Sequence, residues 1–518
     1  MARPACSSPR RAAAAAVLAG LFGGCVHSSA FRCPAEGGPP WVEVESDHFV
    51  VKTNAAPSDA ERMASELEML RMAELGSWEG PYDPPARLEV VVLRNRTEFQ
   101  EFLDPLAQPP PLAYYAWGTR PRVVIGLVLD RDLRWWTVPS LRNRQEEWAQ
   151  AEESRVLRHE LAHHLIGQVL LRQPPWLAEG LACYLEATRL GTWQGRPAAA
   201  VGLPAWDAWA ASRVPAAALF AWRPGERGAR FYDPSWLLVH WLMNRRGAEF
   251  TAYQQRLARA EDPAAAWKAA FPDLDPGDGA AMSRLDRELD AYVGARSYTA
   301  LRIRLPAIEP RWQRRRMPPP EVHALRAELF LQSPFPRADA RSAADAENAA
   351  SLREDPSGLW LALLLRATGQ QERALALGRA AVATHPADWR SWLLLASGLE
   401  GGGEPARERL EALRRAKALL PDDAWALNEV AWGLFQAGAA GEGLPLAARA
   451  AQLAPANASV LDTCGAILAD VGRCPEALLA QRRAVDLLGE RAAPEAAREI
   501  RDRLARIEAR CGTAGASP

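Results

Sequence analysis

The sequence predicts an α+β domain, built from a small sheet and a helical core, followed by an all-α solenoid of helical repeats. Two histidines four residues apart, His159 and His163, lie in a helical pattern that follows a region of alternating strand and helix patterns. Further on, Pro386, Pro421 and Pro455 recur at intervals of 35 and 34 residues, each after a helical pattern. A period of this length is typical of stacked helix pairs.

The composition is typical of a soluble globular protein with a large core. The chain has 518 residues, of which 48% are hydrophobic and 24% charged, a size that suits about two to four domains. The net charge of −1 argues against a nucleic-acid partner, because phosphate binding needs a concentrated cationic excess. No stretch approaches about twenty uninterrupted apolar residues, so no transmembrane bundle is expected.

Residues 1–25 have the pattern of an export signal. Arginines come first, an apolar run over 12–22 is too short to span a bilayer, and Cys25 stands directly after two glycines. This arrangement resembles a bacterial lipoprotein signal, in which the cysteine carries the lipid anchor. Soluble export with cleavage nearby and a retained anchor are the alternatives, and all three place the folded chain outside the cytoplasm. Residues 26–40, rich in proline and glycine, are expected to form a flexible tether.

The best candidate for a functional site is His159-Glu160-Leu161-Ala162-His163. Two histidines at this spacing project from one face of a helix and can share a metal ion, while Glu160 lies nearby without ligating. Catalytic zinc takes three protein ligands and keeps a fourth position open. Glu179 is the candidate third ligand, because the chain between His163 and Glu179 is long enough for a turn and a second helix. The alternative is an amphipathic helix whose histidines only pack.

Together with Trp176-Leu177-Ala178-Glu179-Gly180-Leu181-Ala182-Cys183-Tyr184, this motif resembles the gluzincin zinc metallopeptidases, specifically the peptidase-MA-like, aminopeptidase-N-related group. The resemblance implies an α+β metallopeptidase domain over 41–294, with a small sheet and a helical zinc-binding core. It implies that His159, His163 and Glu179 bind one Zn²⁺ and that Glu160 is the general base. The Gly-x-Met-x-Asn motif with which aminopeptidases bind a free amino terminus is absent.

Several other residues are candidates for roles near the metal. The resemblance places a tyrosine-containing segment beside the zinc, and Tyr232 is the candidate donor to the oxyanion, with His240 a weaker one. Glu186 either orients a ligand histidine or is a solvated carboxylate at the helix end. His48 and His164 are expected to pack rather than to ligate.

The elements expected ahead of the metal helix form a helix-flanked sheet. They are a strand pattern over 41–53 with a kink at Ser46-Asp47, a helix over 58–75, and buried strands over 88–93 and 123–128. The metal helix itself is expected over 152–169. An edge strand beside the site can pair with an extended peptide substrate.

Residues 295–350 are rich in arginine and proline, including Arg314-Arg315-Arg316 and Pro318-Pro319-Pro320. A solvated linker with one helix is the favoured interpretation, and a patch for nucleic acid or membrane is the alternative.

The repeats cover 351–488. Ala381, Ala416 and Ala450 stand at equivalent places before the three prolines, where small side chains let paired helices approach closely. The pattern resembles four tetratricopeptide repeats, with a capping helix over 489–511 and a short tail over 512–518. Such repeats hold a protein partner in a concave groove, and a purely structural array is the alternative.

The cysteines suit an exported protein. Cys33 falls in the expected tether, and Cys183 is expected to fill space in the core. One disulfide is expected near the C-terminus, joining Cys474 to either Cys464 or Cys511.

The combined prediction is an exported zinc-dependent peptidase of the bacterial envelope, held to the membrane only by a lipid on Cys25. Its repeats would recruit a peptide or protein substrate, or a partner protein. The alternative is a non-catalytic envelope adaptor that uses the repeats, with a vestigial or structural metal site. Retention of Glu160, which a site that only binds metal does not need, favours the peptidase.

Overall fold

The computed structural model describes residues 31–77, 85, 87–106, 113–116, 122–126, 144–194, 196–202, 214–223, 229–295, 299–306, 311–361, 371–399, 404–488 and 494–514. The expected signal over 1–25, including Cys25, lies outside these residues. So do the first part of the expected tether, over 26–30, and most of the tail.

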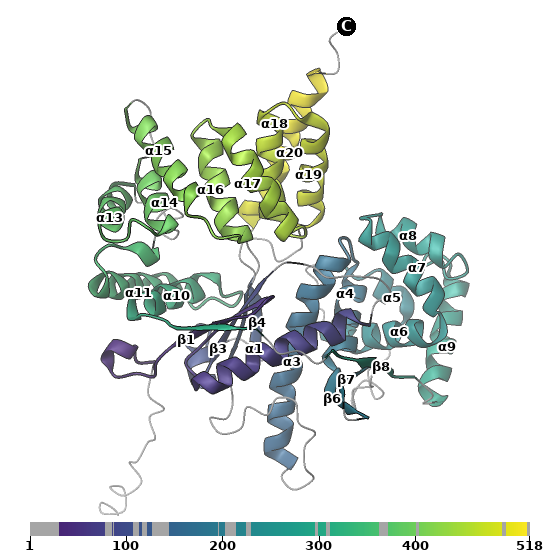
Figure 1. Ribbon diagram of the computed structural model, residues 1–518. Coiled ribbons are helices and arrows are strands. Elements are labelled where there is room, and N and C mark those ends of the chain that lie inside the picture. The colour runs from purple at the N-terminus through teal and green to yellow at the C-terminus, as the bar shows by residue number, and fades with distance from the viewer. Residues whose placement is uncertain are drawn as a thin grey trace, which may run out of the picture.

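A six-stranded mixed sheet organises the first half of the chain (Figure 1). Its strands, in spatial order, are β4 (Ala113–Ala116), β5 (Arg122–Gly126), β3 (Leu88–Leu93), β2 (Phe49–Thr53), β1 (Val42–Glu45) and β9 (Gln313–Arg316). The three central strands β5, β3 and β2 run parallel, and β4, β1 and β9 pair antiparallel at the two sides. In the chain, the short helix η1 (Pro34–Glu36) precedes β1, and the short helix α2 (Arg96–Gln100) lies between β3 and β4.

The two faces of this sheet are covered by different helices. On one face, side chains such as Val51, Val90 and Ile125 share a core with α1 (Pro57–Leu75) and the helices of the metal site. On the other face, residues such as Trp41 and Val91 pack against α10 (Pro319–Gln332). Alternation along each strand produces this division, because successive side chains point to opposite faces.

The expected kinked strand over 41–53 is two strands. β1 and β2 pair with each other as an antiparallel hairpin, with Val44 opposite Val51. The turn falls at Ser46-Asp47, where the Ser46 amide donates to the Phe49 carbonyl. The polar residues there mark a chain reversal rather than a bend in one strand.

The linker predicted for 295–350 is wrong. Its residues form β8 (Leu301–Arg304), the edge strand β9, α10 and α11 (Ala340–Glu354). Arg314 and Arg315 are held by carboxylates, Arg314 by Glu61 at 2.6 Å and Arg315 by Glu43 at 2.6 Å. The basic run is therefore part of the first domain, because its charges are neutralised by acidic residues far away in the sequence.

The tether predicted for 26–40 is also wrong from residue 31 onward. Cys33 is buried, and the Phe31 ring packs under the Arg326 guanidinium, 3.6 Å from the ring centroid. The Phe31 amide donates to a Glu101 carboxylate oxygen at 3.0 Å. This segment is anchored by contacts with α10, which its proline and glycine content did not reveal.

After the sheet come the helices that build the metal site and its support. They are α3 (Arg144–Val169), α4 (Pro175–Glu186), α5 (Ala216–Phe220), η3 (Ala229–Phe231), α6 (Tyr232–Arg245), α7 (Gly247–Ala258), α8 (Pro263–Ala270) and α9 (Gly279–Ala295). A three-stranded antiparallel sheet, β6 (Arg189–Trp193), β7 (Arg196–Val201) and β8, lies beside α1. None of the described helices is long and apolar enough to cross a membrane.

The second half of the chain is a stack of paired helices (Figure 1). Its elements are η4 (Leu359–Leu361), α13 (Gln371–Thr384), α14 (Trp389–Gly398), α15 (Glu404–Ala418), α16 (Ala424–Gln436), α17 (Ala440–Leu453), α18 (Ala458–Asp470), α19 (Cys474–Asp486) and α20 (Pro494–Ala514). This agrees with the all-α solenoid predicted from the proline period. Each proline is followed two residues later by an N-cap, Asp388, Asp423 or Asn457, whose side chain accepts from the first turn of α14, α16 or α18.

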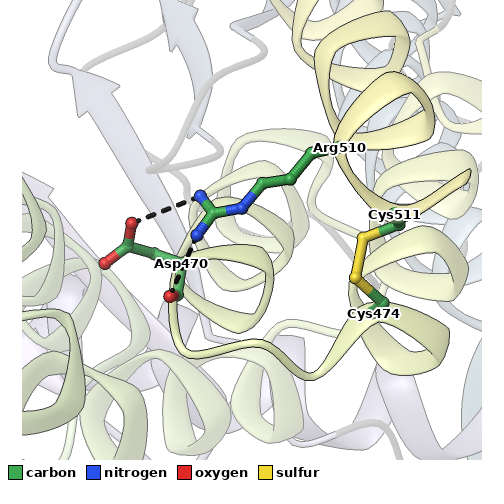
Figure 2. Close-up of a disulfide and its surroundings, with 4 residues drawn as sticks. All are labelled: Asp470, Cys474, Arg510 and Cys511. Carbon is green, nitrogen blue, oxygen red and sulfur yellow. Dashed lines mark hydrogen bonds and ion pairs between the residues drawn. A yellow bond between two sulfur atoms is a disulfide. The ribbon is translucent and has the colours of Figure 1, made fainter. Parts of the chain in front are cut away.

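The cap of the stack is tied to the last helix pair by a disulfide, Cys474–Cys511, which spans a sequence separation of 37 (Figure 2). This resolves the two pairings that the sequence left open, and Cys464 is a free, buried thiol. Beside the disulfide, Arg510 donates to the Asp470 carbonyl oxygen at 3.3 Å and lies 3.4 Å from its carboxylate (Figure 2).

Candidate metal centre

The candidate metal centre lies between α3 and α4, which pack against each other. Pro174 and Pro175 end the connection from α3 and start α4, since proline fits the first turn of a helix. Gly180 lets α6 pack close, because a Cβ there would lie 2.6 Å from the Ser235 carbonyl oxygen and 2.7 Å from a Val239 methyl group. The glycine after Glu179 therefore allows close packing of the helix that carries the third candidate ligand.

Three donor atoms from these two helices converge. His159 Nε2 lies 3.1 Å from His163 Nε2, and Glu179 Oε2 lies 3.3 Å from the first and 3.4 Å from the second. The two imidazole rings meet edge to face, with centroids 4.7 Å apart. Glu179 Oε2 is buried and forms no hydrogen bond of good geometry with any described residue.

This triangle fits a zinc ion. In a tetrahedral site with zinc–ligand distances of about 2.0–2.1 Å, the ligand atoms stand about 3.3–3.4 Å apart. The three measured separations, 3.1, 3.3 and 3.4 Å, agree with that edge length. Two imidazoles and one carboxylate are also the donor types that zinc prefers.

Glu186, at the end of α4, orients the first histidine. Its Oε2 lies 2.9 Å from His159 Nδ1, and its Oε1 lies 3.2 Å from Arg155 Nε. A carboxylate acceptor at Nδ1 fixes the imidazole tautomer that leaves Nε2 as the donor toward a metal. The orienting contact proposed for Glu186 from the sequence is therefore present, and Glu186 is buried rather than solvated.

Glu160 and Tyr232 both adjoin His159, the first in the sequence and the second in space. Glu160 follows His159 on α3, and its Oε2 is buried without a hydrogen-bond partner among the described residues. Tyr232 begins α6, and its ring stacks on His159 with centroids 6.0 Å apart and an interplanar angle of 22°.

Charge at the centre favours an ionised carboxylate. Burial opposes ionisation of Glu179, but the neighbouring His163 and His159 rings hold its pKa well below its usual range. Burial also opposes a charge on His159, but the thiol of Cys183 and the carboxylates of Glu179 and Glu186 raise its pKa well above the usual range. The buried Glu179 carboxylate is thus anionic, and without a metal ion the protonated His159 ring balances its charge; a metal ion that binds here replaces that proton.

Cys183 was not predicted to lie at the site. Its Sγ is 3.9 Å from His159 Nδ1, and burial raises the pKa of the thiol to about 11. Glu179, Cys183 and Glu186 stand at i, i+4 and i+7 of α4, so they share one face of the helix. That spacing was the signal in the sequence, and it places the thiol on the same side of His159 as Glu186 rather than at the metal-facing nitrogen.

The other histidines singled out have other partners. His240 is buried between Tyr292, whose hydroxyl lies 2.8 Å from Nδ1, and the Gly202 carbonyl, 3.2 Å from Nε2. Burial lowers its pKa to about 4, so the ring is neutral and supports packing of α6. His48 binds Glu68 of α1 at 2.9 Å, and His164 is buried on α3.

Comparison with known proteins adds little at this centre. No protein-family model matches the chain, and no curated protein matches it. Among solved structures, the chain is similar to a thermophilic TPR protein of Thermus thermophilus, with 20% identity and a TM-score of 0.28. That match covers 36% of this chain and 98% of the Thermus protein.

Proposed function

We propose that the chain is an exported zinc-dependent peptidase, with His159, His163 and Glu179 as the metal ligands. The observation that carries the proposal is the triangle of donor atoms with edges of 3.1, 3.3 and 3.4 Å. Zinc in such a site polarises a carbonyl and makes water a nucleophile near neutral pH.

Glu160 is the proposed general base and acid. It neighbours His159 on α3 but is not one of the three converging donors, and its buried Oε2 lacks a hydrogen-bond partner among the described residues. This oxygen would accept a proton from the attacking water and return it to the leaving amine. A buried carboxylate oxygen left without a partner is costly unless a ligand or substrate water satisfies it.

Glu186 and Tyr232 are proposed to complete the site. Glu186 holds His159 through Nδ1, and Arg155 in turn holds Glu186. Tyr232, stacked on the same imidazole, would donate its hydroxyl hydrogen to the oxygen of the substrate carbonyl as negative charge develops there.

An extended substrate would pair with β4. This strand is the outermost of the six-stranded sheet on the side where α3 packs, since α3 contacts both β4 and β5. Among the described residues no further strand pairs with the outer side of β4, so an extended peptide can pair with its backbone there.

The helical repeats support a second candidate function, that of a non-catalytic envelope adaptor. We propose that they are tetratricopeptide-like and recruit a substrate or partner protein, as stacked helix pairs do. The adaptor needs no metal, and this separates the two proposals.

Metal analysis of the purified protein beside Glu160→Gln and the control Glu354→Gln tests the peptidase. Zinc should be present at about one ion per chain in all three proteins, because none of these substitutions removes a ligand. Peptide cleavage should vanish only in Glu160→Gln. Absence of zinc from the wild type, or equal cleavage by wild type and Glu160→Gln, would contradict the peptidase and favour the adaptor.

A further inference from the structure

The three-stranded sheet β6–β7–β8 has one apolar and one basic face. Its register places Arg189 opposite Ala200 and Ala200 opposite Arg302, so these side chains share a face. With alternation along each strand, these cross-strand pairs place the following residues on that face: Arg189, Gly191, Trp193, Arg196, Ala198, Ala200, Arg302 and Arg304. Leu190, Ala199 and Ile303 point the other way and pack on α1.

The arginines of this face are exposed and carry no ion pair with any described residue. Arg302 and Arg304 instead lie over the Trp193 ring, 5.9 and 5.0 Å from its centroid. The three strands place four positive charges within an area of about 10 by 14 Å. On a chain whose net charge is −1, this is a local concentration of positive charge with no ion-pair partner among the described residues.

β8 is the last strand of this sheet among the described residues. Its sequence, Leu301-Arg302-Ile303-Arg304, alternates apolar and basic side chains. An outermost strand of this kind can accept a further strand. A strand pairing there would set its alternate side chains directly opposite Arg302 and Arg304.

The chain itself shows which sequence suits an arginine-bearing strand. At the side of the larger sheet, β9 (Gln313-Arg314-Arg315-Arg316) pairs with β1, whose sequence is Val42-Glu43-Val44-Glu45. Glu43 stands opposite Arg315, and their side chains form an ion pair at 2.6 Å. In this pairing Glu43 supplies an acidic partner to Arg315, Glu45 stands opposite Gln313, and the alternating Val42 and Val44 are buried in the core.

We infer that β8 is a docking strand for an extended acidic segment of another polypeptide, in which apolar and acidic residues alternate. The acidic side chains pair with Arg302 and Arg304, and the backbone adds a fourth strand to the sheet. This surface shares no residue with the metal centre, and binding alone tests it, so the outcome is independent of peptidase activity.

The probe is a fluorescein-labelled synthetic peptide, Val-Glu-Val-Glu-Val-Glu. Its binding to the full chain is measured by fluorescence anisotropy. Binding should weaken by about tenfold or more in the double variant Arg302→Glu/Arg304→Glu, because attraction becomes like-charge repulsion. Arg302→Gln/Arg304→Gln is the second variant, with an intermediate loss. Arg287→Glu/Arg506→Glu, which reverses two exposed arginines outside this sheet, should bind as the wild type does. Circular dichroism establishes that each variant is folded.

Two further probes separate strand pairing from attraction of charge alone. A peptide of the same composition in blocks, Val-Val-Val-Glu-Glu-Glu, and an alternating peptide with N-methyl groups at alternate residues should both bind more weakly. Equal binding of either one, or of the charge-reversed variant, overturns the docking strand. Binding of phosphatidylglycerol vesicles without binding of the peptide overturns it as well, in favour of a membrane surface.

Discussion

The contact between α3 and α4 buries polar groups, whereas the contacts between helices of the repeats bury alanines. Between α3 and α4, polar atoms converge: three donors lie within 3.4 Å of one another, and Glu179 is 9% exposed. In the repeats, the contacts are made by alanines: Ala381, Ala416, Ala450 and Ala484, at successive repeats, are each 0% exposed. The first contact is costly unless a cation occupies it, and the second is favourable without a ligand.

This difference predicts different responses to substitution. Removing a polar side chain from the α3–α4 contact should change what the protein binds more than whether it folds, since an apolar core surrounds the site. Enlarging an alanine in the repeats should change stability and leave metal binding intact. The predictions below test this separation, beginning with the largest effect.

Replacing a candidate ligand should remove the metal. His163→Ala leaves two of the three donors, too few to hold catalytic zinc, so metal content should fall from about one ion per chain to near zero and peptide cleavage to background. His164→Gln, on the neighbouring residue whose ring is not among the converging donors, should keep its zinc. Metal analysis after dialysis decides, and zinc retained by His163→Ala would refute the ligand set.

A larger side chain at a helix contact of the repeats should lower the stability of the fold and leave the zinc content unchanged. Ala450 packs among residues such as Leu427 and Val460, with no room for a larger side chain. Ala450→Leu should lower the free energy of unfolding by about 1–3 kcal/mol. Ala448→Leu, two residues earlier and exposed, serves as the control. Denaturant titration gives the stabilities, and a loss of zinc in Ala450→Leu would mean that the two regions are coupled.

The pair α10–α11 lies between these extremes, because an ionic contact joins its helices. His323 Nδ1 lies 2.6 Å from Glu347, which also binds Arg326 at 2.7 Å. Burial lowers the pKa of His323, but contacts with Cys33 and Glu347 more than offset this and raise it to about 9.

Stability should therefore depend on pH through this histidine. Between its usual pKa of about 6.5 and the folded value of about 9, the folded chain binds the proton and the unfolded chain does not. Stability contributed by the protonated ring is present below that window and lost as pH rises through it, by about 3 kcal/mol. Thermal melts from pH 6 to 9 should show the decline in the wild type and in His385→Gln, which alters an exposed histidine. His323→Gln should flatten it, and an unchanged slope there would contradict the assignment.

Local spacing explains how much the sequence could predict. That His159 and His163 share one face follows from their four-residue spacing as soon as the segment is helical, and no tertiary contact is needed to predict it. The proline period predicted the helix pairs, because each Pro is followed by an N-cap residue such as Asp388 at a fixed offset. Glu179 needed more, since nothing local fixes how α4 lies on α3. The length of chain after His163 made it a candidate, and the resemblance to a known motif implied its role as the third ligand.

Pairings across long distances in the chain could not be predicted. The run Arg314-Arg315-Arg316 has the composition of a solvated segment, and two of its partners, Glu61 for Arg314 and Glu43 for Arg315, are more than 250 residues away. The segment from Phe31 has the composition of a tether, and its contacts are likewise with residues far away in the sequence, Glu101 and Arg326. For Cys183, the spacing from Glu179 and Glu186 places the thiol on their face of α4, but its distance from His159 depends on how α4 packs on α3, which one helix alone does not determine.

The smallest expected effect concerns the caps of the repeats. Asp423 accepts from the amides of Trp425 and Ala426, at 3.1 and 3.0 Å, and so satisfies two donors at the start of α16. Asp423→Ala should lower the free energy of unfolding by about 1 kcal/mol, with zinc content unchanged. Asp423→Asn keeps a side-chain oxygen in the same place and should recover most of the loss. Equal destabilisation by both variants would show that the charge of Asp423, rather than its capping oxygen, stabilises this end of the helix.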